Sequence, residues 1–289
     1  MAENTIIVGR YAPSPTGTLH LGNLRTAILA WLHARLQHGV FYLRMEDLDT
    51  PRTVAGSAAA IVSDLQWLGL DWDSDIIYQS QRDTLYDSAL ATLKQQGLIY
   101  PCFCSRKDIQ QAASAPHVTA GVYPGTCANL TRDEIQQRQK SKTPAYRVRV
   151  KASLQDSVGD FVVKRADGLF AYQLAVVVDD LAQGITHVVR GNDLADSAER
   201  QQYLASLLAP NRAPITYLHA PLMLDSDGNK LAKRDGSDSL DTIREQNITA
   251  AELIGQLMFE LKLINSPTAI SLDTLRSKVS IAALTAQLT

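Results

Sequence analysis

The sequence predicts an α/β fold with a parallel sheet, and three observations lead to this prediction. First, apolar, β-branched runs at 5–12 and 40–45 alternate with segments of helical periodicity. Second, the cysteine-bearing segment 100–169 lacks this alternation, which indicates an inserted α+β subdomain. Third, the last part of the chain, 237–289, has helical character, which indicates a short helical C-terminal subdomain.

The elements follow in order along the chain. The strand at 5–12 ends in the breaker cluster PSPTG, and the next helix, 21–36, repeats apolar residues three and four apart and ends before Gly39. The remaining expected helices are 54–68, 81–96, 197–208 and 250–263, and the remaining expected strands are 40–45, 146–152, 175–180 and 186–191. Strands joined by crossover helices predict a Rossmann-type domain whose ligands bind at the carboxyl ends of the strands.

Composition excludes several classes of protein. With 289 residues, 45% hydrophobic and 20% charged, the chain is long enough for a large core and is neither disordered nor fibrous. No apolar run approaches the roughly 18 residues of a membrane span, so we expect no membrane partner. Three cysteines, an odd number, favour a reducing cytoplasm. The net charge of −2 argues against a general polycation, although residues 100–170 hold 11 basic and 6 acidic residues, a local +5 that suits phosphates.

A candidate phosphate-binding turn lies at residues 10–25. The chain has no Gly-Lys pair and therefore no Walker A loop. Instead, His20 and Asn23 flank Gly22 at an expected helix start, which would place backbone N–H groups and an imidazole beside a phosphate. Taken alone, this pattern is also that of an ordinary turn with a capping histidine.

Three motifs in the same order carry a resemblance to a known family. RYAPSPTGTLHLG (10–22) resembles the HIGH region of class I aminoacyl-tRNA synthetases of the glutamyl group, LRMEDLDTPR (43–52) resembles their amino-acid-binding strand end, and KLAKR (230–234) resembles their KMSKS loop. The resemblance runs from residue 5 to about residue 240. It implies a class I synthetase catalytic domain in two halves, 1–99 and 170–236, with L-glutamate and ATP with Mg(II) as substrates.

The resemblance also implies roles for individual residues. Glu46 would bind the ammonium group of glutamate, and the other glutamate-binding residues would be Arg10, Tyr11, Ala12, Pro13, Ser14, Tyr172 and Arg190. The ATP-binding residues would be His20, Gly22, Asn23 and Lys233, with His20, Lys233 and Lys230 as catalytic residues. Two departures from the family pattern are Asn23, in place of the second His of HIGH, and Ala232, in place of the Ser of KMSKS. Taken singly, Arg190 would also suit a surface position and Glu46 a helix cap.

The cysteines suggest a zinc site. Cys102, Cys104 and Cys127 can place three thiolates on one structural Zn(II), which needs a fourth ligand. General zinc chemistry favours His117, because a phenol must first lose a proton with a pKa of about 10. The resemblance favours Tyr123, because the glutamyl-queuosine relatives show Cys-x-Cys followed by Tyr-x3-Cys. Three reduced cysteines without a metal are the alternative.

The expected acceptor depends on the end of the sequence. Only 55 residues follow Arg234, so we expect no separate anticodon-binding domain. YPCFC (100–104), IIYQSQR (76–82) and GNDLADSAERQ (191–201) resemble the truncated glutamyl-Q tRNA(Asp) synthetase family. That resemblance implies a monomer that activates glutamate without tRNA and transfers it to queuosine in the anticodon of tRNA(Asp). The alternatives are a minimal glutamyl-tRNA synthetase that charges a 3′ end, a small-molecule adenylyltransferase with an HxGH motif, and a non-catalytic paralogue.

Overall fold

Two compact units make up the fold. The computed structural model describes residues 6–105, 107–109, 122–223 and 240–289. The first unit combines Met1–Ser80, Gly184–Ala195 and Ile215–Thr289, and the second combines Gln81–Gln183 and Asp196–Pro214. The predicted domain boundaries, which follow motifs and an insertion rather than compactness, stay a prediction.

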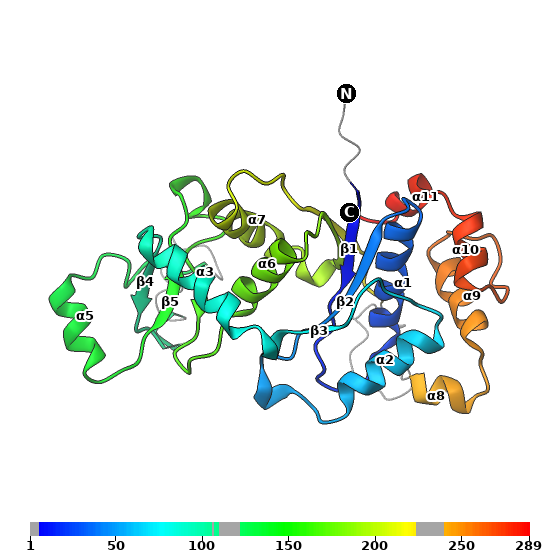
Figure 1. Ribbon diagram of the computed structural model, residues 1–289, viewed down its shortest axis with the longest axis horizontal. Coiled ribbons are helices and arrows are strands. Elements are labelled where there is room, and N and C mark those ends of the chain that lie inside the picture. The colour runs from blue at the N-terminus through cyan, green and yellow to red at the C-terminus, as the bar shows by residue number, and fades with distance from the viewer. Residues whose placement is uncertain (1–5, 106, 110–121, 224–239) are drawn as a thin grey trace. The chain divides into compact units, whose positions relative to one another are not determined.

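Parallel strands form the centre of the first unit, as the sequence predicts (Figure 1). Strands β1 (Val8–Tyr11), β2 (Val40–Met45) and β3 (Ile77–Tyr78) pair in that order, all parallel. Strands β7 (His187–Gly191) and β8 (Thr216–Ala220) form a second parallel pair, and β7 also contacts β1. Because β1 and β2 are parallel and adjacent, their carboxyl ends open on the same edge of the sheet, where this class of fold binds ligands.

Helix α1 (Leu21–Arg35) connects β1 to β2. Its three- and four-residue spacing buries Leu24, Ile28 and Leu32 completely. The chain then turns back at Gly39, where a Cβ atom would lie 2.4 Å from the carbonyl oxygen of Ile7. A glycine is therefore required for β2 to begin beside β1.

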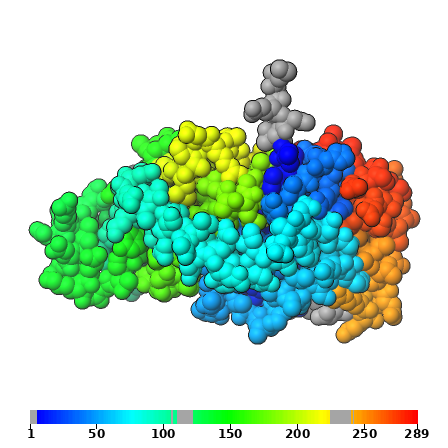
Figure 2. All heavy atoms as spheres, viewed as in Figure 1, coloured from blue at the N-terminus to red at the C-terminus, as the bar shows by residue number. Residues whose placement is uncertain are grey.

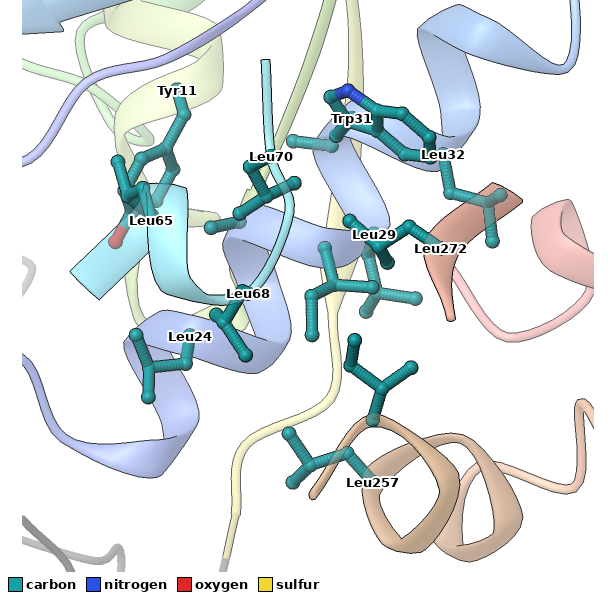
Figure 3. Packing of buried hydrophobic residues seen from close by; sticks show 14 of the residues in the cluster. Tyr11, Leu24, Leu29, Trp31, Leu32, Leu65, Leu68, Leu70, Leu257 and Leu272 are labelled. Carbon is teal, nitrogen blue, oxygen red and sulfur yellow. The ribbon is translucent and has the colours of Figure 1, made fainter. Parts of the chain in front are cut away.

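The core of the first unit joins α1 to α2 (Ser57–Trp67) and to the C-terminal helices (Figure 3). Leu29 of α1 lies among leucines from the chain after α2 and from the C-terminal helices, including Leu257 and Leu272. Those helices are α8 (Leu240–Glu245), α9 (Ala250–Glu260), α10 (Leu272–Lys278) and α11 (Ile281–Thr285). Each fully buried leucine contributes about 1.5–3 kcal/mol to folding. In Figure 2 the red atoms of the last helices adjoin the blue atoms of the N-terminal segment, in agreement with the contact between α1 and α11.

The second unit combines helices with an antiparallel sheet. The helices α3 (Asp83–Gln95), α6 (Tyr172–Ala182) and α7 (Ser197–Leu208) contact one another, and the sheet has the order β4 (Ile99–Cys102), β5 (Ala145–Val148), β6 (Phe161–Lys164). Helix α5 (Arg132–Gln139) precedes β5, so the predicted insertion is indeed α+β. Single turns of 3-10 helix occur at Thr50–Arg52, Gln79–Gln81, Ala152–Leu154 and Asn192–Leu194.

One predicted strand is wrong: residues 175–180 lie in helix α6. Val176 and Val177 are completely buried, so the segment is apolar on several sides and shows no helical stripe. Periodicity cannot separate such a buried helix from a buried strand. The helix is held by the buried carboxylate of Asp179, which accepts hydrogen bonds from Arg82 Nε at 2.6 Å and from the Tyr86 hydroxyl at 2.9 Å.

The other expected elements are confirmed with shifted ends, and β3, β4, β6 and β8 are strands that the periodicity did not predict. Within the described parts of the chain, no helix combines the length and apolar character needed to cross a membrane.

Candidate active site and metal cluster

The turn after β1 is fixed to the end of β2. The carbonyl oxygen of Pro13 accepts a hydrogen bond from the backbone N–H of Glu46 at 2.9 Å. Further along the turn, Gly17, at φ 126°, exchanges two hydrogen bonds with the Ser57 hydroxyl, at 3.1 and 2.7 Å. Ser14, between these two fixed points, is exposed. The structure therefore brings the predicted residues Ala12 to Ser14 together with Glu46.

Glu46 is a buried carboxylate with a fixed partner. Its Oε1 lies 3.2 Å from Nη2 of Arg44, and the two side chains are 7% and 0% exposed. Breaking such a buried pair is costly, so the pair holds the carboxylate in place at the carboxyl end of β2. This charge and position suit the binding of a cationic group, and they do not suit a helix cap.

His20 begins α1 and forms a capping box with Asn23. The Nδ1 atom of His20 accepts the N–H of Asn23 at 3.3 Å, and Oδ1 of Asn23 accepts the N–H of His20 at 3.3 Å. Because Nδ1 acts as an acceptor, a neutral imidazole carries its proton on Nε2. A Cβ atom at Gly22 would lie 3.0 Å from Cε1 of His20, so glycine leaves room for the folded-back ring. The helix start thus presents backbone N–H groups and an imidazole N–H, the donors that an anion needs.

Arg190 is buried in β7 and is 4% exposed, so it is not a surface residue. Its Nε donates a hydrogen bond to Nε2 of His219 on β8 at 3.3 Å, and its Cζ lies 4.6 Å from the centre of the Tyr217 ring. The main chain of His219 pairs with Thr289 through two hydrogen bonds, of 2.8 and 3.1 Å, and Nδ1 of His219 lies 3.3 Å from the Thr289 carbonyl oxygen. Burial, and then the charge of Arg190, lower the pKa of His219, which keeps its Nε2 available as an acceptor.

The other predicted residues have separate positions. Arg10 and Tyr11 are buried in β1, and the Tyr11 hydroxyl donates to the carbonyl oxygen of Asn23 at 3.2 Å. Burial raises the pKa of Tyr11 well above its usual range. Tyr172 belongs to the second unit, where it is the first residue of α6 and is 37% exposed. The remaining predicted residues, Lys230, Ala232, Lys233 and His117, lie outside the described residues.

Three cysteine sulfurs and one phenol meet in the second unit. The Sγ atoms of Cys102, Cys104 and Cys127 all lie within 4.8 Å of one another, and those of Cys104 and Cys127 are 3.6 Å apart. The Oη atom of Tyr123 lies 3.3 Å from Sγ of Cys102 and 3.4 Å from Sγ of Cys104. It also accepts the N–H of Cys127 at 3.0 Å, across a turn at Gly125 with φ 76°.

The spacing of these four atoms fits one tetrahedral zinc ion. With Zn–S and Zn–O bonds of about 2.3 and 2.0 Å, tetrahedral ligands are separated by about 3.8 Å for S···S and about 3.5 Å for S···O. Three of the six separations, 3.6, 3.3 and 3.4 Å, are close to these values. The structure therefore brings the Tyr123 hydroxyl into contact with the sulfurs of the cluster, and its role as the fourth ligand stays a prediction.

The environment of the cluster gives its thiols different acidities. Burial raises the pKa of Cys102, but hydrogen bonds with Tyr123 and Arg147 outweigh it and the pKa is lowered. For Cys104, burial and the charge of Cys102 raise the pKa to about 11. Burial and hydrogen bonds with the thiols raise the pKa of the Tyr123 phenol. A phenol in this position therefore needs a cation beside it before it can act as an anionic ligand.

Sequence reasoning missed three relationships around these sites. Asp47 accepts two hydrogen bonds from Ser80, at 2.8 and 2.7 Å, and so joins the two motifs LRMEDLDTPR and IIYQSQR. Arg25 donates to the carbonyl oxygen of Pro221, which fixes the chain shortly before the KLAKR segment. His219 supports Arg190 from 29 residues away. Only the contact between Asp47 and Ser80 had a signal in the sequence, because both residues lie in motifs that carry the family resemblance.

Comparisons with known proteins agree with this geometry. A family model described as tRNA synthetases class I (E and Q), catalytic domain, matches residues 6–260. A protein of Nocardia farcinica named Glutamyl-Q tRNA(Asp) synthetase is 49% identical over 245 residues, which cover 80% of this chain and 77% of that protein. One of Symbiobacterium thermophilum with the same name is 43% identical over 291 residues, covering 92% of this chain and 90% of the relative.

A solved structure extends the comparison. The crystal structure of a glutamate tRNA ligase from Elizabethkingia meningosepticum in complex with its amino acid superposes with a TM-score of 0.81 at 25% identity. The match covers 96% of this chain but 65% of the ligase, slightly less than two thirds of its length. With a family match over most of its length and relatives above 40% identity, the chain belongs to the class I tRNA synthetases of the E and Q family.

Proposed function

We propose that this protein activates L-glutamate with ATP and Mg(II) and transfers the glutamyl group to tRNA(Asp), on the queuosine at the first anticodon position. The observation that carries the proposal is the fixed arrangement in the first unit, in which the turn that leads to His20 is hydrogen-bonded to the strand end that holds Glu46. The names of the relatives supply the acceptor.

Glutamate has three charged groups, and the first unit offers partners for them. Glu46 pairs with the α-ammonium group, and the buried fork of Arg190 pairs with the side-chain carboxylate. Arg10, with the backbone of residues 11–14, borders the α-carboxylate. The fork of Arg190 can form two charge-assisted hydrogen bonds with a carboxylate but not with an amide, which favours glutamate over glutamine.

Activation is an in-line substitution at phosphorus. An oxygen of the α-carboxylate attacks the α-phosphorus of ATP, the new C(=O)–O–P bond forms, and the bond to the pyrophosphate oxygen breaks. The Nε2–H of His20 donates to an α-phosphate oxygen as negative charge develops there, and Gly22 allows the nucleotide to approach the helix start. Lys233, with Lys230, stabilises the departing pyrophosphate, and Mg(II) neutralises the phosphates.

Transfer uses a hydroxyl group as the nucleophile. A hydroxyl of the cyclopentenediol of queuosine attacks the carbonyl carbon of glutamyl-adenylate, an ester forms, and AMP leaves with the bonding electrons. A ribose hydroxyl at a tRNA 3′ end would react in the same way. The transfer chemistry alone therefore does not distinguish queuosine from a tRNA 3′ end as the acceptor.

We also propose that Cys102, Cys104, Tyr123 and Cys127 hold one structural Zn(II). Three thiolates and a phenolate would complete a closed four-coordinate site, which leaves no open position for a substrate. The ion would join the end of β4 to the segment that precedes α5, and its binding energy would act as local folding energy.

A direct test is transfer of radiolabelled glutamate to three RNAs: queuosine-containing tRNA(Asp), unmodified tRNA(Asp) and tRNA(Glu). We expect label on the first only, together with glutamate-dependent ATP–pyrophosphate exchange in the absence of tRNA. Label on tRNA(Glu), or equal label on both forms of tRNA(Asp), would refute the queuosine assignment. Labelling of tRNA(Glu) would support the second candidate, a minimal glutamyl-tRNA synthetase, which the superposition on a glutamate tRNA ligase favours.

A further inference from the structure

The second unit contains a pocket beside the metal cluster. Its volume is about 400 Å³. The polar and charged residues of its lining are Tyr123, Arg147, Asp160, Tyr172, Gln173 and Arg200, and its apolar residues include Val162 on β6. The volume is that of a nucleotide-sized ligand rather than of a single ion.

The lining of the pocket carries a net positive charge. Its charged residues are two arginines, Arg147 and Arg200, and one acid, Asp160. The Oδ2 atom of Asp160 accepts from the Tyr100 hydroxyl at 2.7 Å, and its Oδ1 accepts from the N–H of Val150 at 2.8 Å. Since the carboxylate oxygens are engaged by neutral donors, the two guanidinium groups and one carboxylate give a net +1 that attracts an anion.

Arg147 is held in the pocket lining by its contacts with Tyr123 and Asp160. Its Cζ lies 3.7 Å from the centre of the Tyr123 ring, and its Nη1 donates to the carbonyl oxygen of Asp160 at 2.8 Å. The residue is 8% exposed, and its Nε has no hydrogen-bond partner within the parts of the chain that the structure describes. A buried guanidinium with a spare donor is costly unless a ligand completes its hydrogen bonds.

The first turn of α6 forms another wall. Its N-cap residue, Ala171, has no side-chain acceptor, so no side-chain cap offsets the positive end of the helix dipole, which favours an anion nearby. Tyr172, 37% exposed, presents a flat ring at the same place. Gln173 is oriented by two hydrogen bonds, with Ser197 Oγ at 3.0 Å and Gln201 Nε2 at 2.9 Å.

We propose that this pocket binds one nucleotide of the acceptor RNA through its phosphate, which lies between Arg147, Arg200 and the start of α6. Arginines are the usual partners of RNA phosphates, and every nucleotide carries one. The assignment to acceptor RNA rests on the proposed function. ATP shares this chemistry, but the proposed function already places ATP at the start of α1.

Binding of fluorescently labelled queuosine-containing tRNA(Asp) to the full chain, measured by anisotropy over a range of salt concentrations, tests the pocket. Arg200→Gln should weaken binding about tenfold and reduce the slope of log K against log salt by about 0.7, the value for one contact to a single-stranded phosphate. Arg276→Gln, an equal charge change at an exposed residue of α10, should leave both quantities unchanged. Unchanged binding and slope in Arg200→Gln would overturn the proposal.

A second pair of variants is independent of Arg200 and matched for folding. Val162 is half-buried at the edge strand β6 and lines the pocket. Val162→Glu should weaken RNA binding and Val162→Lys should strengthen it, although both place a long polar chain at the same position. If both variants weaken RNA binding, or both strengthen it, the proposal is overturned.

Two further measurements separate the alternatives. If Arg200→Gln weakens ATP binding about tenfold but leaves RNA binding intact, the pocket takes free nucleotides and the RNA assignment is overturned. If the unaltered protein labels queuosine-containing tRNA(Asp) while Arg200→Gln binds it normally, the pocket inference fails and the proposed function stands. If the unaltered protein labels no RNA, the proposed function fails, and the anisotropy series still decides the pocket.

Discussion

The guanidinium of Arg190 is held by His219, with 3.3 Å between Nε and Nε2. Since β7 and β8 are parallel and these two residues are direct partners in the register, the contact follows from strand pairing. Nε is turned toward the histidine, so the fork of the guanidinium is directed by a neighbour that does not itself bind glutamate. His219 is therefore a positioning residue for the proposed glutamate site.

His219→Phe should raise KM for glutamate about tenfold, because a hydrogen bond to a charged group contributes about 1.5–3 kcal/mol. The turnover number should change less. Glutamate-dependent exchange kinetics measure both quantities. His219→Gln keeps an acceptor and should restore most of the affinity; if Gln and Phe behave alike, the hydrogen bond has no positioning role.

His20→Ala should reduce adenylate formation by about 10²–10³, the usual cost of one contact to a developing oxyanion. It also removes a helix cap, which costs about 0.5–2 kcal/mol of stability. Thr249→Ala is a matched control, because Thr249 and Glu252 form the same capping box at the start of α9 in the same unit. ATP–pyrophosphate exchange and thermal unfolding of both variants separate the effects: we expect similar stability losses but loss of exchange in His20→Ala alone.

Removal of one cluster ligand should release the metal. Cys127→Ser and Tyr123→Phe should lower the zinc content and the melting temperature of the purified protein, because metal binding contributes to local folding. His117→Ala should retain zinc if Tyr123 is the fourth ligand. Elemental analysis is the measurement, and zinc loss in His117→Ala with retention in Tyr123→Phe would reverse the ligand assignment.

The contact between the buried His33 and the half-buried His187 should make stability depend on pH. Their ring centres are 5.3 Å apart, and burial, followed by the charge of His187, lowers the pKa of His33 to about 4; burial also lowers the pKa of His187. Between an unfolded value of about 6.5 and the folded value, the unfolded chain binds more protons. Stability therefore rises with pH through this window and is lost as the pH falls from about 6.5 toward 4.

Urea unfolding at several pH values measures this dependence. His33→Leu should flatten the slope between pH 6.5 and 4, because it removes a group that must be deprotonated to fold. His38→Asn is the control: His38 is exposed, at φ 53°, a conformation that Asn tolerates. An unchanged slope in His33→Leu would show that other groups cause the acid sensitivity.

Local patterns predicted the parts of this fold that depend on local chemistry. The spacing of Leu24, Ile28 and Leu32 predicted α1, and the motif around His20 predicted a helix start that the capping box now explains. The Val-rich segment of α6 misled the same reasoning, since burial on several sides removes the stripe that marks a helix.

The site residues likewise fall into two groups, those that a local motif predicts and those that depend on contacts between distant segments. Glu46 and the three thiols lie within motifs and were predicted, whereas the support of Arg190 by His219 depends on strand pairing across 29 residues, which no pattern in one sequence reports. The burial of Arg147 could not be predicted either. An arginine in an alternating strand resembles a solvent-facing charge until its packing on Tyr123 is known.

The closeness of Cys104 and Cys127 has a consequence for redox chemistry. Their sulfurs, 3.6 Å apart, need to approach by only about 1.5 Å to reach the 2.05 Å of a disulfide bond. A zinc ion at the proposed site would occupy the thiolates and hold them apart, so its loss would leave two neighbouring thiols open to oxidation. Peroxide would then oxidise Cys104 and Cys127 to a disulfide and block metal binding until a thiol reductant reduces it. The proposed site would thus make the metal-free form sensitive to oxidants at a point where the metal-bound form is protected.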